Sequence, residues 1–261
     1  MNEPDLYMSI VMPALDEEGN ILAAVENALG ALKDYDLRGE IIVVNDGSTD
    51  KTAGLVMEKI KNSPNDRIKF INHDKPKGIG ESFWDGVSQS EGEVVTMFPG
   101  DNENDPWEVM RYVGLLEHVD MVIPFVFNKD VRSLFRNILS FAYRFIINTT
   151  FRVNFHYTNG TILYRKSILS KIKHRSKGFF FQTEILIKMA KRGYLFAEVP
   201  YRLGMRPGGV SKAVSFPSFL QVMRGYYRLI NDIYFSKITK ITKGRFSKTS
   251  KSAKRYESNG R

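Results

Sequence analysis

The first 130 residues alternate between short apolar runs and longer stretches in which apolar residues recur at helical spacing. The runs are rich in Val, Ile and Phe, which is typical of buried strands. Between the first two runs, Ile21, Ala24, Val25, Ala28 and Leu32 follow the spacing of a half-buried helix. The pattern predicts strands over residues 7–12, 40–45, 67–72, 93–98 and 119–126, and further helices over 49–60, 79–90 and 106–117.

This alternation of strands and helices indicates an α/β fold, because each helix carries the chain back to begin the next strand in the same direction. We therefore expect a mostly parallel central sheet covered by helices. In sheets of this kind, ligands bind beyond the carboxyl ends of the strands. The residues that follow each strand are thus the first candidates for a functional site.

After residue 130 the pattern changes to two long amphipathic stretches. The first combines a wide apolar stripe with Arg132, Arg136 and Arg144, and the second covers residues 216–235. One interpretation is an ordinary core-facing helix with solvated arginines. The other is a helix that lies on a membrane surface, where an apolar and a cationic face coexist. The stripe consists of Leu134, Phe135, Ile138, Leu139, Phe141, Phe145 and Ile146.

The charges are divided along the chain. The net charge is +9, yet residues 1–120 carry 24 acidic and 10 basic side chains, residues 121–236 carry 4 and 19, and residues 237–261 carry 1 and 9. This asymmetry favours anionic partners for the second half. A nucleic-acid-binding protein is one alternative, although the acidic first half and the lack of a nucleic-acid motif argue against it. We expect no nucleic acid among the partners.

Other aspects of the composition restrict the class of protein. The chain has no cysteine, which excludes disulfides, zinc–thiolate sites and thiol nucleophiles and fits a reducing compartment. No run approaches the roughly 18–20 apolar residues that span a bilayer, and the acidic N-terminus is not a signal peptide. We expect a cytoplasmic protein, peripheral on the cytoplasmic face of a membrane.

Three segments with acidic residues follow predicted strands: MPALDEE at 12–18, VNDGSTD at 44–50 and FPGDNENDP at 98–106. Any one of them could simply cap a helix or form a turn. Together at one sheet edge they indicate a ligand site. In the third segment Asp101 and Glu103 are two residues apart, so both carboxylates could bind one hard cation such as Mg²⁺ or Mn²⁺. Walker and GxGxxG motifs are absent, which disfavours kinase-like and dinucleotide sites.

These three segments belong to a longer series that resembles a known family. The other members of the series are KGIGESFWDGV, TNGTILYRKSIL, GFFFQTEILIKMAKRGYLFAEVP and RPGGVSK. The series resembles the family-2 glycosyltransferases, and within them the dolichol-phosphate mannose synthase-like branch. The resemblance covers roughly residues 7–213. It implies a GT-A fold, a Rossmann-like nucleotide-binding sheet joined to an acceptor region. It also implies an inverting sugar transfer from a nucleotide diphosphate sugar (GDP- or UDP-sugar), assisted by Mg²⁺ or Mn²⁺.

The resemblance also implies roles for individual residues on the donor side. Three motif positions depart from the family: Leu15 replaces a usual Tyr, Asn45 replaces the first acid of an Asp-Asp pair, and Pro99 replaces the first acid of the Asp-x-Asp motif. Asp46 should contact the base or ribose, and Asp101 and Glu103 should be the metal ligands. The remaining residues implied to bind the nucleotide sugar are Pro13, Leu15, Glu17, Gly78, Asp101, Gln182, Arg206 and Lys212, the last two on a loop that closes over the donor phosphates.

On the acceptor side the resemblance implies a polyprenyl (dolichyl or undecaprenyl) phosphate, with Arg132, Arg136 and Arg144 where the branch places its acceptor-phosphate arginines. Asp101, Glu184, Arg206 and Lys212 would serve catalysis. Glu184 either orients the reacting groups or is a helix N-terminal acid favoured by the helix dipole. A hydroxyl of a saccharide or another soluble molecule is an alternative acceptor, for which Glu184 would become the general base.

The predicted organisation follows from these assignments. Residues 1–213 form the catalytic domain, in which residues 1–120 bind the nucleotide sugar and residues 121–213 bind the acceptor. Residues 214–236 form an amphipathic helix. Residues 237–261 form a basic tail for which the composition predicts disorder and contact with an anionic membrane surface.

Overall fold

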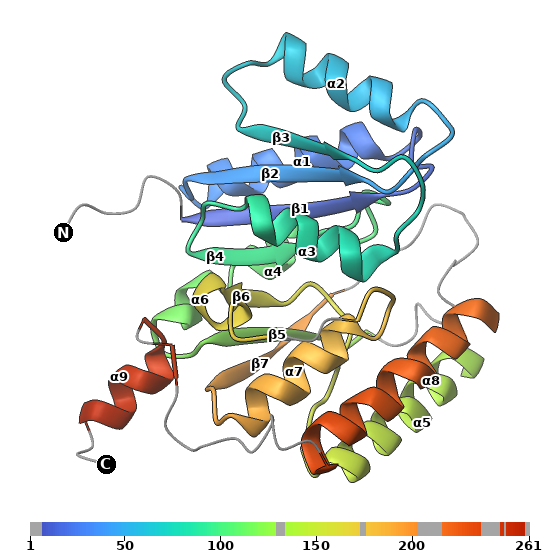
Figure 1. Ribbon diagram of the computed structural model, residues 1–261. Helices are drawn as coiled ribbons and strands as arrows, with labels where there is room; N and C mark the ends of the chain where they lie inside the picture. The colour runs from blue at the N-terminus through green and yellow to red at the C-terminus, as the bar shows by residue number, and fades with distance from the viewer. Residues whose placement is uncertain are drawn as a thin grey trace.

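The computed structural model describes residues 7–128, 134–172, 176–202, 216–235, 246–247 and 249–258. Its centre is a seven-stranded sheet in the order β3-β2-β1-β4-β6-β5-β7, in which only β6 runs antiparallel to its neighbours (Figure 1). The predicted α/β class is therefore confirmed. The strands are β1 (Met8–Ala14), β2 (Gly39–Asn45), β3 (Ile68–Asn72), β4 (Val94–Met97), β5 (Met121–Val126), β6 (Leu163–Arg165) and β7 (Phe196–Tyr201).

Helices cover both faces of this sheet. The helices are α1 (Ile21–Asp34), α2 (Thr52–Asn62), α3 (Ile79–Gln89), α4 (Pro106–Met110), α5 (Leu134–Phe151), α6 (Lys166–Leu169), α7 (Phe181–Lys191), α8 (Phe216–Ile230) and α9 (Lys251–Ser258), with a 3₁₀ turn η1 (Val113–Glu117) and a π-helical turn η3 (Asn231–Phe235).

Two hydrophobic cores form because successive side chains of a strand point to opposite faces. In β1, Ile10 and Met12 belong to the core shared with α1, α4 and η1. Val11 belongs to the second core, which α3, α6, α7 and the end of α5 complete. Every residue of β1 is buried, as expected for a strand covered on both faces.

The helix predicted over residues 106–117 is divided in two in the structure. Asp105 caps the N-terminus of α4 by accepting hydrogen bonds from the backbone N–H groups of Trp107 and Glu108, and Pro106 occupies the first turn. The helix ends at Met110, and the 3₁₀ turn η1 follows. Gly114 lowers the helix propensity of this second part, which is consistent with the tighter turn.

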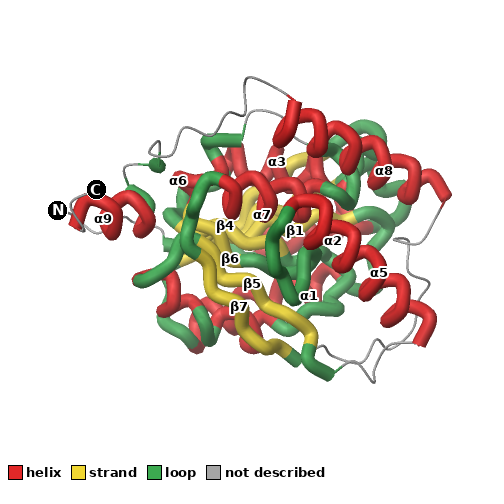
Figure 2. The backbone as a smooth tube through the Cα atoms, turned by 90° about the horizontal axis from the view of Figure 1, so that it is seen from below, coloured by secondary structure: helices red, strands yellow, loops and turns green. Residues whose placement is uncertain are grey.

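The C-terminal tail contains a docked helix, where the composition predicted disorder. The buried Asp120, just before β5, accepts hydrogen bonds from the backbone N–H groups of Lys251 (2.7 Å) and Ser252 (3.1 Å) and from the Ser252 hydroxyl. These bonds satisfy the N-terminal donors of α9. Figures 1 and 2 show α9 at the end of the sheet opposite to α5 and α8. The prediction of disorder is therefore wrong for residues 249–258.

The apolar stripe of α5 faces outward over most of its length. Phe141 and Phe145 are 60% and 62% exposed. Among residues 137–151, whose burial the structure describes, only Ile147 and Phe151 are buried in the core. The interpretation of α5 as an ordinary core-facing helix therefore holds for its last turn. Within the part of the chain that the structure describes, no helix has the length and apolar character needed to cross a membrane.

Glu40 is a buried carboxylate that joins the start of β2 to neighbouring elements. Its Oε1 accepts hydrogen bonds from the Ser9 hydroxyl and the Glu91 backbone N–H, both at 2.6 Å, and its Oε2 lies 2.8 Å from Lys69 Nζ. Burial alone would raise the pKa of Glu40, but the bonds from Lys69, Ser9 and the Glu91 N–H outweigh it and lower the pKa below its ordinary value of 4.5.

This arrangement predicts that Glu40→Gln lowers the free energy of unfolding by an amount that depends on pH. A carboxyl whose pKa is lowered by folding stabilises the protein above its unfolded pKa and loses that contribution as the pH falls through the folded pKa. We expect the variant to lose about 1–3 kcal/mol of unfolding free energy near neutral pH. The difference from wild type should narrow on acidification, as measured by urea denaturation at several pH values. A difference that stays constant down to strongly acidic pH would contradict this account.

Candidate active site

The loops that follow β1 and β2 are joined by reciprocal hydrogen bonds. The Asp16 backbone N–H donates to Ser48 Oγ at 2.9 Å, and the Thr49 N–H returns a bond to Asp16 Oδ1 at 2.8 Å. Glu18 and the residues around Asp50 exchange two similar bonds, each 3.0 Å long. The two acidic segments predicted from the sequence therefore form one structural unit at the carboxyl edge of the sheet.

Asp46 lies at the centre of this edge and is buried. Its Oδ1 accepts hydrogen bonds from His73 Nδ1 and the Lys77 backbone N–H, both at 2.8 Å, and its Oδ2 accepts one from the Gly78 N–H at 2.9 Å. Burial would raise the pKa of Asp46, but the bonds from Lys77, His73 and Gly78 outweigh it and lower the pKa. Asp46 is therefore an ionised acid that holds the loop over residues 73–78.

Two glycines allow this loop to approach so closely. Gly47 has φ +76°, and a Cβ there would lie 2.6 Å from the Lys75 carbonyl carbon. Gly78 has φ +101°, and a Cβ there would lie 2.9 Å from the Lys177 carbonyl oxygen. A side chain at either position would be strained and would displace the neighbouring backbone. The site around Asp46 is thus built by backbone contacts as much as by side chains.

The loop after β4 presents Asp101 and Glu103 beside the first two loops. Gly100 donates its N–H to the Pro13 carbonyl oxygen at 2.9 Å, and the Glu103 N–H donates to Asp101 Oδ1 at 3.1 Å. Both acidic side chains are half-buried. The described residues contain no group of three or more His, Cys, Asp or Glu side chains that could hold a metal ion. Two carboxylates nevertheless fit a hard cation that takes its other ligands from substrate phosphates and water.

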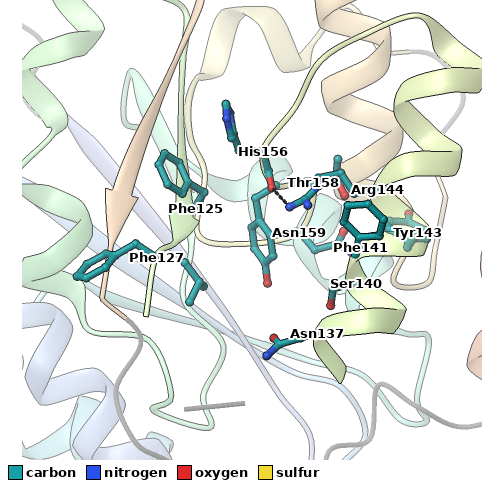
Figure 3. Close-up of a pocket in the computed structure, with 12 residues that line it drawn as sticks. Phe125, Phe127, Asn137, Ser140, Phe141, Tyr143, Arg144, His156, Thr158 and Asn159 are labelled. Atoms are coloured by element: carbon teal, nitrogen blue, oxygen red, sulfur yellow. Dashed lines mark hydrogen bonds between the residues drawn. The ribbon is translucent and has the colours of Figure 1, made fainter. Parts of the chain in front are cut away.

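A cavity of about 410 Å³ lies at the carboxyl end of β5, between α5 and the segment over residues 156–159 (Figure 3). Arg144 lies on its wall, donates to the His156 carbonyl oxygen at 2.9 Å and is positioned 5.6 Å from the centre of the Phe141 ring. The rings of Phe125 and His156 stack with centres 5.3 Å apart. Polar and aromatic groups therefore share the cavity, which also includes Phe127, Asn137, Ser140, Tyr143, Thr158 and Asn159.

The first turn of α7 holds one wall of this cavity. The Gln182 amide accepts from the Gly160 N–H at 3.0 Å and donates to the Gly160 carbonyl oxygen at 2.5 Å. Thr183 Oγ1 lies 2.8 Å from the Tyr143 hydroxyl of α5, and burial raises the pKa of Tyr143. Gln182, which the sequence assigned to the nucleotide sugar, is thus engaged with the segment that leads into β6.

Glu184 is buried and paired within the protein. Its Oε2 accepts from the Ser176 N–H at 2.6 Å, and its Oε1 lies 2.5 Å from Lys188 Nζ. Lys188 Nζ also lies 3.2 Å from Asp232 Oδ2 in η3. The carboxylate of Glu184 therefore belongs to a buried cluster that joins α7 to η3. Glu184 stands in the first turn of α7, as the helix N-terminal interpretation expected, whereas its pairing with Lys188 was not predicted from the sequence.

The structure brings together part of the predicted set. Asp46 and Gly78 are in contact, and the Asp101–Glu103 loop is bonded through Gly100 to Pro13, a buried residue of β1. Leu15 is half-buried, and the carboxylate of Glu17 accepts a hydrogen bond from the Asn20 side chain at 2.9 Å. Arg132, Arg206, Lys212 and the side chain of Arg136 lie outside the described residues.

Sequence reasoning missed His73 and Tyr201. His73 bonds Asp46, and the Tyr201 hydroxyl at the end of β7 donates to Asn104 Oδ1 at 3.1 Å, which links the loop after β4 to β7. Both contacts join residues far apart in the chain, so no local spacing announces them. The one available signal was the position of each residue at or just beyond the carboxyl end of a strand.

The chain resembles known proteins in sequence. The family model described as Glycosyl transferase family 2 matches residues 9–173. The chain is 27% identical over 177 residues to a dodecaprenyl-phosphate galacturonate synthase of Rhizobium johnstonii, a match that covers 66% of this chain and 52% of that protein. It is 30% identical over 140 residues to an undecaprenyl-phosphate 4-deoxy-4-formamido-L-arabinose transferase of Yersinia pestis, covering 54% and 42%. The chain thus spans about half the length of these curated relatives.

Solved structures share the fold. A glucosyl-3-phosphoglycerate synthase of Mycobacterium tuberculosis in complex with uridine diphosphate superposes with a TM-score of 0.66 at 20% identity, covering 87% of this chain and 80% of that chain. The same enzyme with Mn²⁺, UDP-glucose and phosphoglyceric acid gives 0.63 at 21% identity, with the same coverage. These likenesses support the GT-A architecture that the sequence predicted.

The double hydrogen bond from Gln182 to Gly160 generates a prediction. Replacing Gln182 with Ala removes both bonds and deprives the half-buried Gly160 N–H of its acceptor, while the Gly160 carbonyl oxygen still accepts from the Ile162 N–H. We therefore expect about 1–2 kcal/mol less unfolding free energy. The Gly160 amide should also exchange its hydrogen faster, as measured by hydrogen-exchange mass spectrometry. Gln89→Ala, at an exposed position at the end of α3, is the matched control. If the Gly160 amide exchanged its hydrogen no faster in Gln182→Ala than in wild type, the two hydrogen bonds between Gln182 and Gly160 would not be formed.

Proposed function

We propose, since the chain belongs to glycosyl transferase family 2, that it transfers a sugar from a nucleotide diphosphate sugar to the phosphate of a polyprenyl lipid. The names of both curated relatives state a polyprenyl phosphate as the molecule on which they act. One observation carries the proposal for this chain. The loop with two carboxylates and the cavity beside Arg144 lie at the same edge of the sheet, and the outer wall of that cavity belongs to a helix with an exposed apolar face.

The donor, a GDP- or UDP-sugar, would bind over the edge formed by the loops after β1, β2 and β4. Asp46 would face the base or ribose, and the backbone around Gly78 would lie against the nucleotide. Pro13, Leu15 and Glu17 would border the base. Arg206 and Lys212 would contact the diphosphate, because guanidinium and ammonium groups form strong charge-assisted bonds with phosphate oxygens.

Asp101 and Glu103 would hold Mg²⁺ or Mn²⁺. When bound, such an ion neutralises negative charge that develops on a leaving diphosphate. The carboxylate pair and its backbone support are consistent with that role. The solved neighbours that contain Mn²⁺ or Mg²⁺ with uridine diphosphate also share the fold of this chain, which supports the same expectation.

The acceptor phosphate would enter the cavity beside Arg144, together with Arg132 and Arg136 earlier in the same region. A phosphate oxygen would attack C1 of the sugar from the face opposite the diphosphate. The new C1–O bond would form as the old one breaks, and the nucleoside diphosphate would leave with inversion at C1. No proton has to be removed, because the attacking oxygen is already anionic.

The ion pair between Glu184 and Lys188 supports this acceptor over a hydroxyl. A hydroxyl acceptor needs a base that is within reach of the reacting proton. Glu184, the candidate for that base, is 2% exposed and lies 2.5 Å from Lys188 Nζ. Its carboxylate would instead position α7, and through Gln182 the wall of the cavity.

The exposed face of α5 and α8 would contact the membrane that carries the lipid. Phe141, Phe145 and Ile146 of α5 and Tyr227 of α8 are each at least 50% exposed. Aromatic and aliphatic side chains with nearby arginines are typical of helices that lie in the interface of a membrane. We place this contact on the cytoplasmic face, in line with the absence of cysteine.

The metal assignment predicts that Asp101→Asn abolishes transfer. We expect kcat/KM to fall by about 100-fold or more, because a ligand of the charge-neutralising ion is lost. The measurement is nucleoside diphosphate release with a polyprenyl phosphate in detergent, with Mg²⁺ or Mn²⁺ present. Asp36→Asn, at an exposed position with φ +51°, is the control and should retain activity. A variant at Asp101 that keeps metal-responsive activity would refute the assignment.

The membrane contact predicts that Phe145→Ser combined with Ile146→Ser weakens binding to vesicles of anionic phospholipid. Each side chain of this size contributes about 1.5–3 kcal/mol when fully buried, so we expect at least about tenfold weaker partitioning in a sedimentation assay. Met57→Ser is the control, because Met57 is 59% exposed on the distant helix α2. Equal binding of the double variant and wild type would contradict a contact through α5.

A further inference from the structure

A buried histidine bridges two carboxylates beside the proposed nucleotide site. His73 Nδ1 lies 2.8 Å from Asp46 Oδ1, and His73 Nε2 lies 2.9 Å from Asp85 Oδ2. The histidine side chain is 2% exposed, that of Asp46 is 7% exposed, and that of Asp85 on α3 is 38% exposed. No role described so far uses His73 or Asp85.

Hydrogen bonding determines the charge of this ring. A neutral imidazole has one N–H and one lone pair, so it can donate to only one of two carboxylates. The other carboxylate would then face a lone pair across about the same short distance, which is repulsive. Only an imidazolium donates from both nitrogens. The geometry therefore assigns a proton to each ring nitrogen of His73.

The surrounding charges are compatible with a buried cation. Asp46 faces the ring from the end of β2, and Asp85 faces it from α3. Lys77 is the nearest other cation described here, with Nζ 3.5 Å from Asp85 Oδ2. Asp74 and Lys75 adjoin His73 in the chain and are exposed. The two carboxylates in direct contact thus outweigh the nearby positive charge and stabilise the imidazolium.

His73 also begins the loop that Asp46 holds. Its backbone N–H donates to the Asn45 carbonyl oxygen at 2.9 Å, and the loop ends with the Lys77 and Gly78 N–H groups on the Asp46 carboxylate. The Asp46 carboxylate is therefore oriented on one side by the His73 ring and on the other by the N–H groups of Lys77 and Gly78. Loss of one ring proton would turn one of the two bonds into a repulsive contact.

We infer that His73, as an imidazolium anchored by Asp85, is a positioning residue that orients Asp46 and the loop over residues 73–78 to receive the nucleoside diphosphate. This inference rests on the proposed function, in which Asp46 contacts the base or ribose. His73 touches none of the proposed reacting atoms. It therefore acts on donor affinity and leaves the rate of the bound complex unchanged.

The experiment measures UDP and GDP binding by calorimetry with Mg²⁺ at neutral pH, together with transfer kinetics. His73→Gln should bind both nucleotides about tenfold or more weakly than wild type, with KM for the donor raised by about tenfold or more and kcat within about threefold of wild type. His118→Gln, at an exposed position, is the matched control and should behave as wild type.

Asp85→Asn keeps the inference testable if His73→Gln does not fold. An Asn amide can either accept from or donate to His73 Nε2, so the second ring proton is no longer enforced. We expect UDP and GDP to bind about threefold or more weakly than to wild type, with kcat within about threefold of wild type. Disruption of packing alone would lower kcat together with affinity, and that result would overturn the inference.

Nitrogen-15 NMR of the histidine rings, with the His73 signals assigned from the His73→Gln spectrum, tests the charge without any nucleotide. Both ring nitrogens of His73 should carry protons at about pH 7. A neutral ring would overturn the inference whatever the protein binds. A doubly protonated ring in a protein that binds neither nucleotide would overturn the proposed function, and the positioning role with it. Nucleotide binding that is equal in wild type, His73→Gln and Asp85→Asn would overturn the inference alone.

Discussion

The arrangement of the donor edge depends on one buried carboxylate, that of Asp46. Its backbone N–H donates to the Ala14 carbonyl oxygen at the end of β1, and its side chain binds three donors from the segment after β3. Three chain segments thus converge on a single residue. Parallel strands deliver their carboxyl ends to the same edge, but only specific bonds of this kind turn three loops into one rigid surface.

The half of the chain that we propose binds the acceptor has a corresponding centre in the first turns of α7. Gln182 fixes Gly160, Thr183 contacts Tyr143, and Glu184 binds both Lys188 and the Ser176 N–H. The adjoining Lys177 carbonyl oxygen accepts bonds from the N–H groups of Gly80 and Glu81 at the start of α3. Backbone contacts therefore connect the segment before α7 to the first turn of α3. Removing Lys188 would take away the cation that lies between the buried carboxylates of Glu184 and Asp232 beneath this connection.

The spacing of apolar residues along the chain was sufficient to predict most strands and helices. It was insufficient to predict the long-range contacts that complete the site. Strands and helices in the first 130 residues follow periodicities of two and 3.6, and the structure places them within a few residues of the predicted bounds. The three-residue strand β6 and the docking of α9 on Asp120 depend on partners far away in sequence, so no window of residues signals them. The same holds for His73, whose partners lie 27 residues before it and 12 after it. Asp101 and Glu103 could be found because both stand in one short loop.

The antiparallel strand β6 has a consequence for how this architecture can change. Because β5 and β6 are antiparallel neighbours, the chain leaves the sheet after β5 and returns into β6 at the same edge. Helix α5 and the cavity wall over residues 156–159 lie within this single excursion. Such an excursion can lengthen, shorten or be exchanged with little effect on the strand register, since loop closure depends only weakly on length. The segment between β5 and β6, which we propose receives the acceptor, can thus change in length and sequence while the strands of the sheet keep their register.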